Sequence, residues 1–221
     1  METELIRKFV VYIPALLVAV TFHEVAHGYV ALRLGDPTAK LLGRLTLNPI
    51  PHIDLFGSII MPAILIYISN GQFFFAYAKP VPINPMNFRN PRKGMALSAA
   101  AGPVTNILLA LASVILLKLV FAPIAGLSPE MVRETLMKPL LMIISASVIV
   151  NVVLATFNMI PIPPLDGGRV LTGLLPSRQA LFFSKIEPFG FIIVLVLIYT
   201  GIANLFIMPV ITFFLNIFGM L

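Results

Sequence analysis

The chain has 221 residues, of which 59% are hydrophobic and 11% charged, and its mean hydropathy is +1.00. This composition excludes an ordinary soluble globular protein and predicts a polytopic membrane protein. The net charge of +6 does not indicate nucleic-acid binding, because the basic residues stand singly between apolar runs, as in loops at a lipid surface. The chain has no cysteine, so a metal site must use histidine and carboxylate ligands.

The first apolar run covers about residues 9–33 and is long enough to cross a bilayer as a helix. Its ionisable residues and its lack of a small-residue cleavage site favour a mature helix over a signal peptide. It contains His23, Glu24 and His27, which are costly in lipid unless they are paired or bind a metal. Two histidines four residues apart project from one helix face at the spacing that one Zn²⁺ bridges, with Glu24 beside them. The run therefore predicts a zinc site inside the membrane.

The segment after this span is irregular. Residues 55–69 are apolar but too short to cross the ~30 Å hydrocarbon layer, so we expect a re-entrant element. Residues 72–87 join an aromatic cluster to a proline-rich stretch, which predicts a short membrane-associated β or extended segment. Its unpaired edge is a candidate docking surface for an extended peptide, with Tyr77, Lys79 and Val81 as substrate-binding residues. The alternative is a surface hairpin with no role in substrate binding.

Two further spans are predicted, at residues 94–120 and 139–160. The first of them begins with small residues, and we expect Gly102 to serve close helix contact and Asn106 to form an interhelical hydrogen bond. The apolar region 186–221 predicts either one long tilted helix or a hairpin of two shorter ones.

A catalytic zinc with two histidine ligands needs a third protein ligand, and a carboxylate is the favoured donor. Asp166 fits, because it follows the third span at a Pro/Gly turn and is the only carboxylate between Glu134 and Glu187. His52 is a rival ligand, unless it is an interfacial hydrogen-bonding residue, and Asp54 is a rival of similar weight.

Taken together, these motifs resemble the site-two proteases, which are intramembrane zinc metalloproteases. The resemblance covers nearly the whole chain, and this chain resembles a compact form without a recognisable PDZ or CBS domain. The matching residues are His23-Glu24-Val25-Ala26-His27-Gly28, Ala101-Gly102-Pro103 with Asn106, and Asn158 with residues 161–168.

The resemblance implies a role for each matching polar residue. His23, His27 and Asp166 would be the zinc ligands. Glu24 would be the general base, and Asn158 would be a catalytic polar group that donates a hydrogen bond near the scissile carbonyl.

Asn151 is a further match, which we expect to contact the substrate. The expected fold is an all-α polytopic membrane protein, a single protease domain over residues 1–221 with a three-helix catalytic core. The expected activity is hydrolysis of peptide bonds within the transmembrane segment of a single-pass protein, after another protease has removed its outer domain. A zinc or proton-coupled transporter and an inactive membrane scaffold are the alternatives.

Shared zinc ligands also constrain the topology. The first and third spans must run parallel, so one crossing separates them and residues 55–69 return without crossing. The connections 34–93 and 161–185 then share a face, which with Arg33 holds ten of the fifteen basic residues. The positive-inside rule places the zinc toward the cytoplasmic side, and we expect the cell membrane of a prokaryote. The ten residues are Arg33, Lys40, Arg44, Lys79, Arg89, Arg92, Lys93, Arg169, Arg178 and Lys185.

Overall fold

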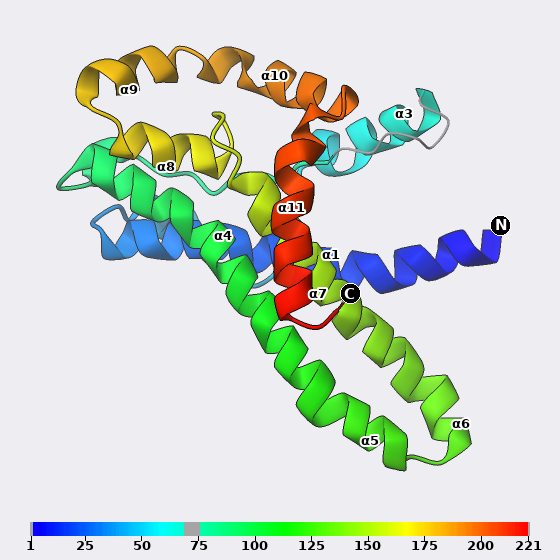
Figure 1. Ribbon diagram of the computed structural model, residues 1–221. Helices are drawn as coiled ribbons and strands as arrows, with labels where there is room; N and C mark the ends of the chain where they lie inside the picture. The colour runs from blue at the N-terminus through cyan, green and yellow to red at the C-terminus, as the bar shows by residue number, and fades with distance from the viewer. Residues whose placement is uncertain (1, 69–75, 221) are drawn as a thin grey trace.

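The computed structural model describes residues 2–68 and 76–220, and within them it is helical with no β-strand (Figure 1). Three helices are long and apolar enough to cross a membrane, as the sequence predicts. They are Phe9–Arg33, which is the main part of α1 (Glu2–Arg33), Pro91–Leu127 and Glu130–Asn158. The prediction of a helical polytopic membrane protein is confirmed.

The second and third spans are each built from several helical segments. The second joins α4 (Pro91–Ile115), the π-helical η4 (Leu116–Phe121) and α5 (Ala122–Leu127). The third joins α6 (Glu130–Val132), the π-helical η5 (Arg133–Met137) and α7 (Lys138–Asn158). Asn90 caps α4 by accepting a hydrogen bond from the Lys93 N–H, and Pro91 occupies the first helical position, where a missing N–H costs nothing.

Short elements fill the connection between the first two spans. They are α2 (Thr38–Leu41), η1 (Ile50–His52), the π-helical η2 (Leu55–Ile60), α3 (Met61–Ile68) and η3 (Pro85–Asn87). The apolar helix Leu55–Ile68 is shorter than a bilayer crossing. Residues 76–84 form neither helix nor strand, so the described part of the predicted β or extended segment contains no β-strand, and residues 69–75 lie outside the described residues.

The C-terminal region is a series of four helices. They are α8 (Asp166–Leu174), α9 (Ser177–Ser184), α10 (Glu187–Tyr199) and α11 (Ile202–Ile217). The α9–α10 pair is bent by 67° and would add a fourth span if it were counted as one. Gly201 separates α10 from α11 with a φ of +75°, a conformation that favours glycine. Of the two alternatives for residues 186–221, the structure therefore has two shorter helices.

Helices α1, α4 and α7 cross one another through buried polar contacts. His23 pairs with Asn106, and His27 contacts the Ser98 carbonyl, so α1 and α4 run antiparallel. Asn106 also pairs with Asn151, and further along α4 Ser113 pairs with Ser147 in α7, which makes α4 and α7 antiparallel as well (Figure 1). Helices α1 and α7 therefore run in the same direction, and the chain after α7 returns to the histidine-bearing end of α1.

Asp36 holds the loop after α1 against the segment that leads into α4. Its side chain is fully buried, and it accepts hydrogen bonds from Thr38, from the Asn84 N–H at 2.7 Å and from the Asn87 amide at 2.7 Å. Burial by itself raises the pKa of Asp36, but these hydrogen bonds outweigh it and hold the pKa below its ordinary value. The carboxylate thus fixes residues 84–87 beside the end of α1.

We expect Asp36→Asn to destabilise the folded protein by about 1–3 kcal/mol at neutral pH, because it leaves buried N–H groups without their charged acceptor. A group with a lowered folded-state pKa stabilises fully above the ordinary carboxyl pKa of about 4 and loses this effect as the pH falls through the lowered value. The unfolding temperature in detergent should therefore differ between the two proteins at pH 7 and converge in acid. Glu130→Gln, an exposed carboxylate change, is the control, and a difference that does not diminish as the pH falls below the ordinary carboxyl pKa of about 4 would contradict this account.

Candidate metal centre and active site

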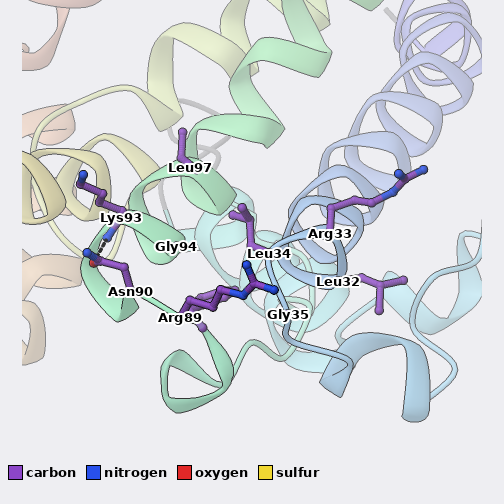
Figure 2. A pocket seen from close by; sticks show the side chains of 10 residues that line it. Leu32, Arg33, Leu34, Gly35, Arg89, Asn90, Lys93, Gly94 and Leu97 are labelled. Atoms are coloured by element: carbon purple, nitrogen blue, oxygen red, sulfur yellow. Dashed lines mark hydrogen bonds between the residues drawn. The ribbon is translucent and has the colours of Figure 1, made fainter.

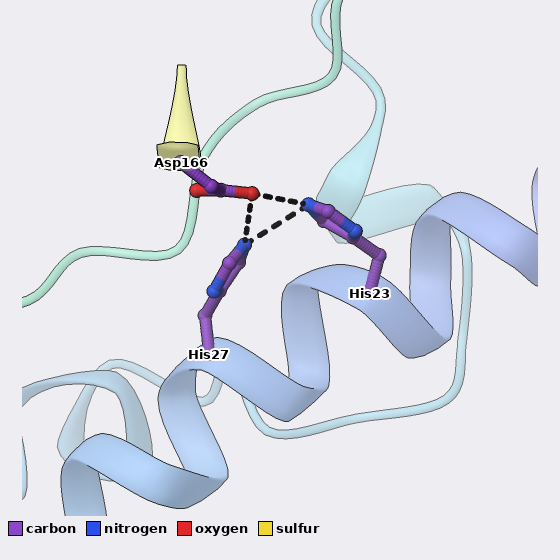
Figure 3. Close-up of side chains that lie close together, drawn as sticks. All are labelled: His23, His27 and Asp166. Atoms are coloured by element: carbon purple, nitrogen blue, oxygen red, sulfur yellow. Dashed lines mark hydrogen bonds and ion pairs between the residues drawn. The ribbon is translucent and has the colours of Figure 1, made fainter. Parts of the chain in front are cut away.

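Three buried ligand atoms converge between α1 and the start of α8. His23 and His27 lie one turn apart on α1, and Asp166 is the first residue of α8. The two Nε2 atoms are 3.0 Å apart, and Asp166 Oδ2 lies 3.1 Å from His23 Nε2 and 3.3 Å from His27 Nε2. Figure 3 shows the three side chains directed at one point. No more than 7% of any of these residues is exposed.

Hydrogen bonds to the other ring nitrogens determine which histidine atoms are free. His27 Nδ1 lies 2.7 Å from the Ser98 carbonyl oxygen, which only accepts, so Nδ1 carries the proton. His23 Nδ1 lies 2.6 Å from Asn106 Oδ1. In a neutral ring with its proton on Nδ1, Nε2 has no proton and carries a lone pair. In both histidines this lone pair points at the other ligand atoms.

The orientation of the Asn106 amide follows from its own partners. Asn106 Nδ2 donates to the Ala19 carbonyl at 3.2 Å and to Asn151 Oδ1 at 2.8 Å. Asn151 Nδ2 in turn donates to the Ser147 carbonyl at 2.8 Å. Because both carbonyls can only accept, both amides are fixed, and Asn106 must present its oxygen to His23.

These atoms fit a zinc ion. Two imidazole lone pairs and a carboxylate oxygen at about 3 Å repel one another unless a cation lies among them, and Asp166 Oδ2 has no hydrogen-bond partner among the described residues. Ligand atoms about 2.0 Å from a tetrahedral zinc stand about 3.3 Å apart, close to the three separations here. Among the described residues, His23, His27 and Asp166 form the group able to hold a metal.

The comparisons with known proteins agree with this chemistry. Residues 11–201 match the family model of Peptidase family M50. The chain is 40% identical to YwhC of Bacillus subtilis over 88% of its own length and 82% of YwhC. YwhC is provisionally named a zinc metalloprotease.

The chain belongs to peptidase family M50. This is the site-two protease family, so the expected membership is confirmed, and the protein is a membrane zinc metalloprotease with Zn²⁺ as its cofactor. It is also 25% identical, over 96% of its length, to Rip2 of Mycolicibacterium smegmatis, another provisionally named zinc metalloprotease, of which 75% is covered. No solved structure matches the chain significantly.

In this M50 peptidase, Glu24 lies between the two histidines in sequence and is hydrogen-bonded to the extended segment. Its Oε2 accepts a hydrogen bond from the Val81 N–H at 2.8 Å. Val81 is buried, and its side chain packs on Gly28, where an added Cβ would stand 2.9 Å from Val81 Cγ1. The segment with the predicted substrate-binding residues thus passes directly beside the predicted general base.

Alternate residues of this segment form backbone hydrogen bonds to the rest of the protein. The Tyr77 N–H donates to the Gly57 carbonyl, and the Lys79 N–H donates to the His52 carbonyl. Tyr77 also covers Gly57 with its ring, where an added Cβ would lie 2.4 Å from the ring. The segment is therefore held by the 3-10 helix η1, the π-helical η2 and the Glu24 side chain, and no described residue pairs with it as a strand.

Glycines let the backbone approach the metal centre. A Cβ on Gly102 would lie 2.5 Å from His27 Nε2, and one on Gly167 would lie 2.3 Å from the Met159 carbonyl oxygen. A Cβ on Gly168 would lie 2.2 Å from Pro163 N. Gly102 was expected to serve close helix contact, and the structure places it directly against His23 and His27.

The two predicted asparagines on α7 lie in different surroundings. Asn151 is fully buried, and its amide is bound to Asn106 and Ser147, so it has no exposed surface for the expected substrate contact. Asn158 is partly exposed and donates to the Leu154 carbonyl at 3.0 Å, which leaves its second N–H available. The expected interhelical hydrogen bond of Asn106 is present, but its partners, His23 and Asn151, were not identified from the sequence.

The rival metal ligands lie elsewhere. His52 is buried with Nε2 2.9 Å from the Thr46 carbonyl, and it is not part of the ligand group. Asp54 caps η2 by accepting a hydrogen bond from the Gly57 N–H at 2.7 Å. Both side chains serve the connection between the first two spans.

Gly102→Ala should lower zinc affinity roughly 10- to 100-fold, because its methyl group would displace imidazoles whose orientation the metal requires. Competition with a chelator, using purified protein, measures this affinity. Gly126→Ala is the matched control, since nothing lies within 4 Å of a Cβ at that position. Equal affinities in the two variants would refute the steric argument.

Asn106→Ala should also weaken zinc binding roughly 10- to 100-fold, because His23 would lose the acceptor that fixes its tautomer. Asn106→Asp, which keeps an oxygen toward His23, should retain more of the affinity. The exposed Asn204→Ala serves as the control. If Asn106→Ala binds zinc like the native protein in the same chelator competition, Asn106 does not orient His23.

Proposed function

We propose that this M50 peptidase is an intramembrane endopeptidase that hydrolyses peptide bonds within transmembrane segments of other proteins. The observation that carries the proposal is the convergence of His23 Nε2, His27 Nε2 and Asp166 Oδ2 beside Glu24, near the end of a membrane helix. In this proposal the three convergent residues hold Zn²⁺. When bound, the ion would supply Lewis-acid chemistry, lowering the pKa of water and polarising a carbonyl.

The chain's own residues supply the remaining steps. Glu24 accepts a proton from the attacking water at its carboxylate and later passes it to the leaving amine. Its hydrogen bond from the Val81 N–H holds this carboxylate in place beside the histidines. Asn158 donates its free N–H to the oxyanion that develops on the scissile carbonyl.

The proposed substrate is the transmembrane segment of a single-pass protein that another protease has already shortened, as in regulated intramembrane proteolysis. Its helix must unwind locally, because a helical peptide bond is shielded by its own hydrogen bonds and side chains. Residues with weak helix propensity near the cut should therefore favour cleavage. Tyr77, Lys79 and Val81 lie on the segment beside Glu24, which supports this segment as the place where the unwound peptide docks.

Glu24→Gln should reduce the rate of hydrolysis by about 10²- to 10⁴-fold while zinc remains bound. The glutamine amide keeps an oxygen acceptor for the Val81 N–H, but it cannot accept a proton from water. Purified protein in detergent, a panel of transmembrane peptides and metal analysis provide the measurement, with Glu130→Gln as the control. Undiminished cleavage with zinc retained would exclude Glu24 as the general base. Zinc transport into vesicles without any peptide cleavage would favour the transporter alternative, and absence of both activities the inactive scaffold.

The location of the active site can be tested separately. We propose a prokaryotic cell membrane with the metal centre toward the cytoplasm, on the basis of the charge asymmetry of the connections. The chain has no cysteine, so single substitutions at Met86, which is 82% exposed, and at Leu127, which is 89% exposed, give unambiguous labels. Met86→Cys should react from the cytoplasmic side and Leu127→Cys from the opposite side. The reverse pattern would contradict this orientation.

A further inference from the structure

A pocket of about 360 Å³ lies where the first candidate span ends and the second begins. Its walls come from residues 32–35 at the end of α1, residues 88–90, 93 and 94 at the start of α4, and Leu97 (Figure 2). Because two apolar spans meet their polar connection here, the pocket lies at one membrane boundary. It is separate from the candidate metal centre, which lies about one to three helical turns closer to the N-terminus of α1.

The pocket is cationic, and two of its three cations have no partner among the described residues, while Arg33 is bound to the Tyr29 hydroxyl and ring. Arg33, Arg89 and Lys93 line it, and it has no acidic lining residue. Arg89 and the Lys93 ammonium have no hydrogen-bond or ion-pair partner among the described residues, and both side chains are exposed. Figure 2 shows Arg89 directed toward Gly35 across the pocket, with Lys93 on the α4 side and Arg33 on the α1 side. Asp36, the nearest acid in the sequence, is fully buried by its own partners and does not offset these charges.

The helix terminus itself contributes little to anion binding. Asn90 already accepts hydrogen bonds from the Lys93 N–H through its side chain and from the Gly94 N–H through its carbonyl, and Pro91 has no N–H. Recognition of an anion therefore depends on the arginine and lysine side chains, which suit phosphate oxygens.

An apolar stripe leads from the pocket along α4. It begins at Leu97, which lines the pocket, and continues on the same helix face at intervals of three, four and seven residues. Its side chains are 43–59% exposed: Leu97, Val104, Leu108, Leu111 and Ile115. Leu97 and Leu108 are about 16 Å apart along the helix, close to the thickness of one ~15 Å leaflet. Val104 and Leu108 also line an apolar groove of about 300 Å³ shared with α7 and α11.

We propose that this pocket binds the phosphate of an anionic phospholipid, whose acyl chain lies along the α4 stripe. The cationic side chains select for a phosphate group with net negative charge, and the adjoining stripe selects for a lipid over a free phosphate. The bound headgroup would join the end of α1 to the start of α4, the two helices that carry the zinc histidines and their hydrogen-bonding partners.

Native mass spectrometry of the delipidated full chain in a neutral detergent tests the proposal. Phosphatidylglycerol should bind more tightly than phosphatidylcholine. The double variant Arg89→Gln and Lys93→Gln should weaken phosphatidylglycerol binding roughly ten- to thirtyfold, because each of the two basic residues adds a similar factor to the affinity for an anionic lipid. The matched control is Arg178→Gln with Lys185→Gln, which removes the same charge from exposed positions in the connection that shares this face.

Three results would overturn the proposal. Equal weakening in the two double variants would mean general attraction of anionic lipid, and equal binding of the two lipids would mean that charge is not recognised. Glycerol phosphate or inorganic phosphate that displaces the lipid at similar concentrations would mean that the pocket takes a soluble phosphate. Zinc content and unfolding temperature, which both substitutions should leave unchanged, verify that every variant is folded.

Discussion

The arrangement of this protein depends on three lone pairs that meet in an apolar surrounding. His23 and His27 turn their Nε2 atoms toward Asp166 Oδ2 because their Nδ1 protons are engaged elsewhere. In water such atoms would be hydrated, but here each is buried, and only a cation makes their approach favourable. The candidate metal centre thereby brings the start of α8, which follows α7, to the C-terminal part of α1, and α1 and α7 accordingly run in the same direction.

Glycines allow neighbouring backbone segments to lie close to these three ligand atoms and to one another. Gly102 brings α4 against both histidines, while Gly167 and Gly168 place the first turn of α8 directly on the turn that follows α7. Gly190 does the same for α10, where a Cβ would collide with the Pro163 carbonyl. In soluble proteins such glycines weaken helices, but in a membrane close backbone approach is itself a source of stability. The candidate metal centre is therefore held from four helices, although its three candidate ligands come from only two of them.

The sequence predicts features that depend on local spacing or on the cost of charge in lipid. Such features are the spacing of His23 and His27, the three spans and the isolated Asp166. The structure has the three candidate spans and brings the three side chains together. The contact of Val81 with Glu24 joins residues 57 apart, and the pairing of Asn106 with Asn151 joins residues 45 apart. No helical or strand period encodes such contacts, so their partners could not be identified from the sequence. The β or extended segment was predicted from an aromatic cluster and a proline-rich stretch, but strand formation also needs a neighbouring strand, which the described residues do not provide.

The backbone of residues 77–81 limits how a peptide could dock on it. In extended backbone, the N–H and C=O of one residue point to the same side, and those of the next residue point to the opposite side. Tyr77, Lys79 and Val81 turn their N–H groups toward the protein, and the carbonyls of Tyr77 and Lys79 accept from Ser58 and Arg44. The outer edge then belongs to residues 78, 80 and 82, and prolines at 80 and 82 have no N–H to donate. That edge offers carbonyl acceptors with a single N–H, so a peptide added there must supply most of the donors. An unwound transmembrane segment has such free N–H groups, whereas an intact helix has already used them within itself.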